Sequence, residues 1–331
     1  MRALSPTVFT SDNPSITIIG AGPSAMLTAL ILAEHKLSCT LVGKASTMKD
    51  LRTTTLMQPA IKLLKKLAIW QDIAHEAAPL REMQLVDQTR RLIPAPFISF
   101  QAKEVQQDAF GYNIPNQILN QALSNALHQN SAVHIKPHYA KDFLPSASHI
   151  QVILDDGSHF LTQFLVGADG KYSRVREKAG IKITSQSKGQ TALVLVFSHV
   201  LPHNFASREF HTPFGPCTQV PLPGNKSSLI WVMQDQQAEQ YLALSRTQLG
   251  EKIEEQLQYC LGKITIETPA QSWLLSSFQA EYFAVNNFFL VGEAAHLFPP
   301  IGAQGLNLSI RDAQSLAELL RNAKERKETN T

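Results

Sequence analysis

The chain has 331 residues, of which 44% are hydrophobic and 17% are charged. This composition fits a globular enzyme of one or two domains with a substantial core, and it excludes extensive disorder. The formal net charge is only +3, with no stripe of lysine and arginine, which excludes a nucleic-acid-binding protein. Cys39, Cys217 and Cys260 lie far apart and form no C-x-x-C pair. We therefore expect a reduced, cytoplasmic protein without a metal site.

The N-terminal segment carries no long apolar core, so it does not resemble a signal peptide. The longest helical apolar stretch, residues 25–33, is too short to span a bilayer. We expect a cytoplasmic protein that can still lie at the periphery of the inner membrane.

The first elements form a βαβ unit. A β-branched run at residues 15–19 predicts a buried strand, which is followed by a glycine turn, an apolar helix and a second strand at 38–42. An amphipathic helix is predicted over 58–69. Residues 81–93 read as two short strands joined at Asp87-Gln88-Thr89.

Along the rest of the chain, the predicted elements change from mixed α/β to mainly β-strands and then back to mixed α/β. We predict a helix over 115–128, a hairpin over 150–167 turning at Asp155-Asp156-Gly157, short strands over 190–233, a helix over 245–260, a strand over 288–291 and a final helix over 305–324. The order predicts an α/β nucleotide-binding domain interrupted by an antiparallel-sheet domain. The expected bounds are 1–80, 108–184 and 276–331 for the nucleotide-binding domain, and 81–107 and 185–275 for the substrate-binding sheet domain.

The first motif is Gly20-Ala-Gly-Pro-Ser-Ala25, a G-x-G-x-x-A run between a strand and a helix. Gly20 permits a tight turn, Gly22 lets the backbone approach a pyrophosphate, and Ala25 lets helix and strand pack closely. The helix N-terminus offers N–H groups to the phosphates. A glycine turn alone also occurs in other α/β proteins, but the strand–turn–helix context favours dinucleotide binding.

The second motif is Gly167-Ala-Asp-Gly-Lys-Tyr-Ser-Arg-Val-Arg176. Asp169 is expected at the carboxyl end of the sheet, where α/β proteins bind ligands, with its carboxylate free to accept from ribityl or ribose hydroxyls. Ser173 fits a helix N-cap, and Arg176 is a cation within reach of phosphate. Asp-Gly alone is an ordinary turn, whereas the whole run is far more specific.

The third motif, residues 292–307, follows a strand and leads into an amphipathic helix. Leu306, Ile310, Ala313, Ala317 and Leu320 share one face of this helix. Residues 302–307 place backbone N–H groups at the helix N-terminus, which suits the negative charge of a reduced flavin. The alternative is a structural loop and helix.

Taken together and in this order, the three motifs resemble the para-hydroxybenzoate-hydroxylase-like flavoprotein monooxygenases. Other segments resemble the branch that hydroxylates ubiquinone precursors: Arg52-Thr-Thr-Thr-Leu56, Leu67-Ala-Ile-Trp70, Phe110-Gly-Tyr-Asn-Ile-Pro-Asn-Gln-Ile-Leu119, Phe214-Gly-Pro216, Pro221-Leu-Pro223 and Ser228-Leu-Ile-Trp231. The resemblance spans about residues 15–322.

This resemblance implies a discontinuous, glutathione-reductase-type (GR2) Rossmann-like FAD/NAD(P)-binding domain with an inserted antiparallel-sheet substrate domain. It also implies FAD as cofactor and NAD(P)H as a transient electron donor. The cofactor-binding residues that it implies are Gly20, Gly22, Pro23, Ser24, Ala25, Arg52, Gln117, Asp169, Gly292, Glu293, Pro300, Gly302, Ala303, Gln304, Gly305, Leu306 and Asn307.

Three departures from the family pattern stand out. Gly43 occupies the end of the second strand, where an acid would hold the ribose hydroxyls. Glu293 stands where the family has Asp, which lengthens the acid by one methylene. The final helix is followed by few residues, where many relatives continue. We therefore expect weaker or reversible flavin binding.

The implied reaction hydroxylates an electron-rich phenol, and a polyprenylated ubiquinone precursor fits best as the substrate. His296 is the sharpest candidate for acid–base catalysis, but a local capping or packing role is the favoured interpretation. Tyr112 and His211 are further pocket candidates with the same alternative.

A membrane-resident substrate implies contact with a membrane surface or a biosynthetic complex. The basic group Lys62, Lys65 and Lys66 reads as a solvated helix face. The alternatives are an isoprenoid-reducing flavoprotein and a non-catalytic flavin-binding partner.

Overall fold

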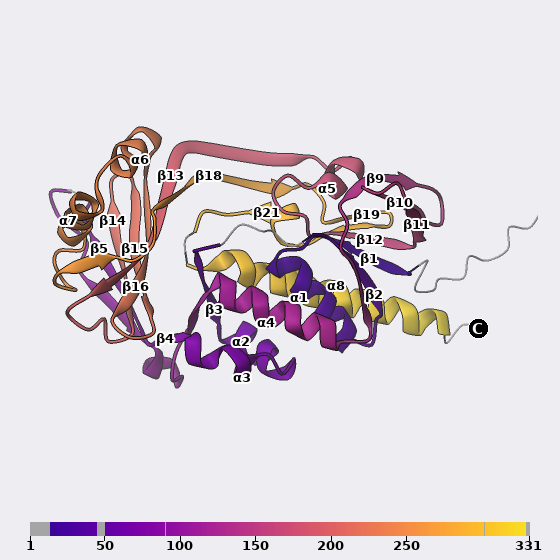
Figure 1. The fold of residues 1–331 in the computed structure, drawn as a ribbon, viewed down its shortest axis with the longest axis horizontal. Helices are drawn as coiled ribbons and strands as arrows, with labels where there is room; N and C mark the ends of the chain where they lie inside the picture. The colour runs from indigo at the N-terminus through magenta and orange to yellow at the C-terminus, as the bar shows by residue number, and fades with distance from the viewer. Residues whose placement is uncertain (1–13, 45–49, 90, 301, 329–331) are drawn as a thin grey trace, which may run out of the picture.

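A computed structural model describes residues 14–44, 50–89, 91–300 and 302–328 of the chain (Figure 1). The expectation about the N-terminal segment therefore falls on residues that lie outside the described ones. The two largest sheets lie at opposite ends of the molecule, and a layer of helices covers one face of the first (Figure 1).

The first sheet has six strands in the order β19-β20-β12-β1-β2-β8. Their bounds are β1 Ile16–Ile19, β2 Cys39–Val42, β8 Val133–Lys136, β12 Phe164–Gly167, β19 Ala284–Val285 and β20 Phe288–Leu290. All neighbours pair in parallel except β19, which runs antiparallel to β20. The carboxyl ends of the parallel strands therefore meet at one edge, as a Rossmann-like domain requires.

Three helices cover one face of this sheet: α1 Pro23–Glu34, α4 Asn116–Gln129 and α8 Gln304–Glu328 (Figure 1). Helix α1 is apolar on all sides because it packs within one core cluster with both of the other helices and the sheet. The predicted stripe of α8 is confirmed, since Ile310, Ala313, Ala317 and Leu320 are buried in that cluster.

The other face is covered by a three-stranded meander of β9 Ala140–Pro145, β10 Ile150–Leu154 and β11 His159–Thr162, which shares a second core cluster with the sheet. The predicted hairpin is therefore partly wrong. Strand β10 pairs with β11, while the apolar run that ends at Gly167 is β12 of the first sheet. Both runs are apolar, so the sequence pattern did not separate them.

Beneath the helices lies a small sheet of β3 Thr53–Met57, β7 Gly111–Pro115 and β4 Ala78–Leu80, in the order β3-β7-β4. The short helices α2 Gln58–Lys66, α3 Trp70–Ile73 and η1 Ala74–Glu76 continue from it. Lys62, Lys65 and Lys66 are exposed on α2, and Lys66 pairs with Glu34.

The second large sheet has nine strands, in the order β21-β18-β13-β16-β15-β14-β5-β6, with β17 also pairing with β13. Their bounds are β5 Glu82–Asp87, β6 Ile98–Gln101, β13 Ile183–His199, β14 Ala206–Thr212, β15 Gly215–Leu222, β16 Lys226–Gln234, β17 Ile264–Ile266, β18 Gln271–Ala280 and β21 His296–Leu297. The helices α6 Asp235–Leu242 and α7 Arg246–Gln256 pack on it, and η2 Ala102–Val105 follows β6. The strand expected within 81–93 after the Asp87 turn lies instead at β6, beyond a longer connection.

Two long strands join the parts of the molecule. Strands β13 and β18 run along the top of the view from the region of helix α5 Arg174–Lys178 to the distant sheet (Figure 1). Their ranges cross the expected bounds at residues 184 and 275, and the domain bounds stay a prediction. Among the described residues, no helix combines the length and apolar character that crossing a bilayer needs.

The short helix α5 Arg174–Lys178 is fixed by a buried cation. Ser173 caps it as expected, because its side chain accepts from the Arg176 backbone N–H. The Arg176 guanidinium does not reach toward a phosphate site, which corrects the expectation. It is buried, donates to the carbonyls of Ala294 and Lys171 at 2.8 Å each, and lies over the Phe278 ring.

We expect Arg176→Met to lower the free energy of unfolding by about 2–4 kcal/mol, because it leaves two carbonyls without their donors. Urea denaturation measures the change. Lys178→Met is the control on the same helix: its exposed pair with Asp142 should contribute less than about 1 kcal/mol. Equal stability of the two variants would contradict the role given to Arg176.

Candidate cofactor site

The carboxyl ends of β1, β2 and β12 border a cavity of about 510 Å³. The turn before helix α1, the loop after β12 and the turn between β8 and β9 also line it. The predicted site residues that line this cavity are Gly20, Gly22, Pro23, Ser24, Arg52, Asp169 and Glu293. Ala25 lies just behind the turn and is fully buried.

The glycine turn is shaped by close backbone contacts. Gly20 has φ +141°, its N–H donates to the Val42 carbonyl at 2.9 Å, and a Cβ added to it would lie 2.3 Å from the Ala168 carbonyl oxygen. Gly20 is therefore required by the protein's own packing. Gly22 differs, because an added Cβ would meet nothing within 4 Å. That open space at the N-terminus of α1 suits a pyrophosphate.

Asp169 presents an unpartnered acceptor. Its Oδ2 accepts from the backbone N–H groups of Arg174 at 2.8 Å and Val175 at 3.3 Å. Its Oδ1 is buried without a hydrogen-bond partner in the structure. Desolvation by burial raises the pKa of this carboxyl above its ordinary value. Because a buried acceptor without a donor is costly, a ligand hydroxyl in the cavity fits this position.

Arg52 joins the cavity to the second sheet. Its Nε and one terminal nitrogen donate to the Asp50 carboxylate at 2.8 and 2.7 Å, and its guanidinium lies 4.2 Å from the centroid of the Trp273 ring on β18. The hydrogen bond that Arg52 donates to Asp50 raises the pKa of Arg52, and the negative charge of nearby Glu293 adds to this rise. Asp50 was not predicted from the sequence.

The third motif divides into two places. Residues 292–294 form η3 Gly292–Ala294, where Gly292 has φ +62° and an added Cβ would lie 2.5 Å from the Ser309 hydroxyl. Glu293 is exposed and lines the cavity. The later residues do not line it: Pro300, Gly302, Ala303, Gln304, Gly305, Leu306 and Asn307 surround the start of α8.

Asn307 ties this start of α8 to β3. Its amide oxygen accepts from the Met57 backbone N–H, and its amide nitrogen donates to the Thr55 carbonyl, both at 2.9 Å. Gln117 is exposed in the first turn of α4 and is not part of the cavity lining either. Their roles toward FAD stay predictions.

His296 is buried, and the cavity lining does not include it. Its Nε2 lies 2.7 Å from an Asp312 oxygen that also accepts from the Gly292 N–H at 3.0 Å. The rings of Phe283 and Phe298 flank it. Asp312 therefore holds both ends of the turn that carries Glu293.

The other two pocket candidates also have protein partners. Tyr112 packs edge-on against Trp70, with ring centroids 4.8 Å apart. His211 is exposed and lies 3.0 Å from a Glu209 oxygen.

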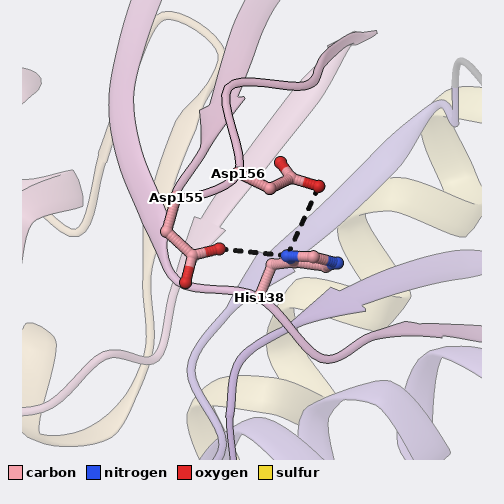
Figure 2. A group of neighbouring side chains, drawn as sticks. All are labelled: His138, Asp155 and Asp156. Carbon is pink, nitrogen blue, oxygen red and sulfur yellow. Dashed lines mark hydrogen bonds and ion pairs between the residues drawn. The ribbon is translucent and has the colours of Figure 1, made fainter.

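A polar corner of the cavity was not predicted from the sequence. Lys44, His138 and Tyr139 line the cavity, and Asp155 and Asp156 lie beside them on the turn between β10 and β11. Figure 2 shows both carboxylates directed at one nitrogen of His138, at 3.0 and 3.7 Å. His138, Asp155 and Asp156 lie close enough together to offer three ligand atoms to a metal ion. However, the Lys44 ammonium already lies 2.7 Å from Asp155 and supplies the positive charge there. We therefore assign no metal to this group.

The comparisons with known proteins agree with this geometry. A family model described as "FAD binding domain" matches residues 14–328. The ubiquinone hydroxylase UbiL of Rhodospirillum rubrum is 29% identical over 92% of this chain and 72% of its own length. The 3-demethoxyubiquinol 3-hydroxylase of Escherichia coli is 27% identical over 95% of this chain and 81% of its own length. The resemblance inferred from the motifs is confirmed.

The fold comparison points the same way. The p-nitrophenol 4-monooxygenase PnpA of Pseudomonas putida superposes with a TM-score of 0.76 at 16% identity, over 95% of this chain and 81% of that one. The similarity confirms the predicted mixed α/β fold with its Rossmann-like layer.

We expect Asp169→Asn to weaken FAD binding by about tenfold or more, since it removes a charged acceptor from the cavity. The unliganded variant should unfold at the same temperature as the parent or higher. The raised pKa means that the folded state holds its proton more tightly than the unfolded state, so the ionised carboxylate costs stability at neutral pH. Flavin fluorescence titration and thermal unfolding give the two readouts; a variant that binds FAD normally removes Asp169 from the site.

Proposed function

We propose that this chain, which belongs to the FAD binding domain family, is an FAD-dependent monooxygenase that uses NAD(P)H and oxygen to hydroxylate a phenolic ring. The observation that carries the proposal is the cavity where the Gly20 turn, the open approach at Gly22 and the unpartnered Asp169 oxygen meet. These three features fit a dinucleotide with hydroxyl groups along its chain.

FAD supplies the redox and oxygen chemistry when it is bound. The chain's own residues bind and orient it. The N-terminus of α1 would receive the pyrophosphate, and Asp169 would accept a hydrogen bond from a hydroxyl. Arg52, held by Asp50 and stacked on Trp273, places a cation between this cavity and the second sheet. Glu293 faces the same cavity on a turn fixed by Asp312. The start of α8 lies outside the cavity lining, and its backbone N–H groups would stabilise the negative charge of a reduced flavin ring.

The substrate that we propose is a polyprenylated ubiquinone precursor. The names of the two curated relatives support this class, because both describe hydroxylation of ubiquinone or its precursors. The nine-stranded sheet, joined to the cavity side by β13 and β18, supplies the surface on which a ring would be placed.

We expect the purified protein to be yellow, and NAD(P)H to bleach its flavin faster when a phenolic substrate is present. Oxygen consumption should match the hydroxylated product mole for mole. Stopped-flow absorbance, an oxygen electrode and product mass measure the three quantities. An isoprenoid-reducing enzyme would bleach the flavin without stoichiometric oxygen uptake, and a non-catalytic partner would bind FAD without turnover. A chain that ignores added FAD would contradict the proposal at its first step.

A lipid surface is the partner that we propose for the loop before β6. Leu92 is fully exposed, Ile93 is 83% exposed and Phe97 is 61% exposed. The loop is held in this form at its base, because Asp87 accepts from the N–H groups of Thr89 at 2.8 Å and Ala95 at 2.6 Å. An apolar tip on a fixed loop suits insertion among lipids.

The charge beside this tip supports an anionic bilayer rather than a neutral partner. Arg91, directly before the tip, and Lys103, in η2 beyond β6, are both exposed, and cations at a membrane surface are attracted to anionic headgroups. A cytoplasmic chain docked in this way would meet a membrane-resident substrate at the periphery of the inner membrane.

We expect the double variant Leu92→Ser/Ile93→Ser to bind vesicles of phosphatidylglycerol and phosphatidylcholine at least about tenfold more weakly than the parent, because two apolar side chains no longer insert. Co-sedimentation measures the bound fraction. Leu319→Ser on α8 is the control, since Leu319 is 65% exposed and apolar. Lipid docking would be contradicted if both variants lost vesicle binding equally. It would also be contradicted if the loop mediated self-association of the protein in the absence of vesicles.

A further inference from the structure

The acid that Rossmann-like proteins place at the end of the second strand is excluded here by packing. Gly43 follows β2, and a Cβ added to it would lie 2.5 Å from the Gly20 carbonyl oxygen and 2.9 Å from the Ala21 Cβ. The obstacle is largely backbone, which cannot move aside as a flexible side chain can. The missing acid is therefore a consequence of how the glycine turn packs against β2, and the ribose needs other partners.

Three side chains occupy that corner of the cavity. Lys44 follows Gly43, while His138 and Tyr139 come from the turn between β8 and β9. The Lys44 ammonium lies 5.0 Å from the centroid of the Tyr139 ring. Tyr139 is 59% exposed, so its aromatic surface is open to a ligand. A cation, an imidazole and an aromatic ring thus stand where a carboxylate would be expected.

Asp155 holds these three residues together. Its carboxylate accepts from Lys44 Nζ at 2.7 Å and from His138 Nδ1 at 3.0 Å, and its backbone N–H donates to the Tyr139 carbonyl at 2.9 Å. The hydrogen bond from Lys44 is the main cause that lowers the pKa of Asp155 to about 2, so the carboxylate stays ionised. Because His138 Nδ1 donates to Asp155, the neutral ring keeps an acceptor at Nε2.

We propose that Lys44, His138 and Tyr139, fixed by Asp155, form the adenosine subsite for FAD. The Tyr139 ring stacks with adenine. The Lys44 ammonium donates to a ribose oxygen, and His138 Nε2 accepts from a ribose hydroxyl. The subsite rests on the proposed function only in that FAD is the ligand of this cavity.

The test compares FAD with FMN, which carries the flavin and one phosphate but no adenosine. We expect Lys44→Met, His138→Ala and Tyr139→Ala each to raise the Kd for FAD by about tenfold, while the Kd for FMN stays within about twofold of the parent value. Flavin fluorescence quenching measures both constants in the full chain. Competition by ADP, which carries the adenosine without the flavin, should weaken by the same factor as FAD binding.

Two further variants serve as controls. Lys178→Met removes an ammonium that pairs with Asp142 at 3.0 Å outside the cavity lining, so it should leave both constants unchanged. Gly43→Glu restores the acid of other family members, yet we expect it to weaken FAD binding because its side chain displaces the Gly20 turn.

The outcomes separate the subsite from the cofactor assignment. An unchanged Kd for FAD in the three variants, an equal loss for FMN, or tighter FAD binding by Gly43→Glu would each overturn the adenosine subsite. Parent protein that binds neither FAD nor FMN would instead overturn the proposed function. Thermal unfolding of each variant before titration identifies any variant that fails to fold. For the folded variants, weaker competition by ADP supports the adenosine subsite, and unchanged competition contradicts it.

Discussion

The arrangement of the site depends on the backbone contacts of one glycine turn. Gly20 packs against the Ala168 carbonyl at the end of β12, and Gly43 packs against the Gly20 carbonyl at the end of β2. Neither position has room for a Cβ, so the ends of three parallel strands are drawn together around the N-terminus of α1. The cavity borders this junction. Its lining therefore combines backbone of the glycine turn with side chains that follow the strands.

The same contacts decide which charges surround the cavity. They leave Asp169 at the end of β12 with one oxygen bound to the start of α5 and the other without a partner. They exclude an acid at the end of β2 and bring Lys44 to that corner instead. Asp169 and Lys44 therefore give two parts of the cavity different charges, which suits a long ligand whose two ends differ.

The cavity is coupled to the distant sheet through few but specific contacts. Arg52 stacks on Trp273 of β18, and the Thr53 hydroxyl lies 2.9 Å from the Ser228 hydroxyl of β16. The Asn113 amide donates to the Pro221 carbonyl. These contacts join the second large sheet to the Arg52 segment and to the small sheet of β3 and β7, and β18 reaches back to pair with β21 after η3. A substrate on that sheet would therefore meet a cofactor whose position is already set, as a hydroxylation reaction requires.

The sequence by itself determined the elements whose signals are local. The β-branched run at β1, the glycines and proline at the start of α1, the Ser173 cap and the apolar stripe of α8 each follow from residues within one or two turns, and the family motifs lie on them. Only the tertiary structure decided the partner of β10, the burial of Arg176, the Asp312 support for His296 and the corner formed by Lys44, His138 and Asp155. Those contacts join residues as many as 118 positions apart in the chain. Burial and hydrogen bonding between such distant segments leave no periodic pattern in the chain, so no local pattern could have predicted them.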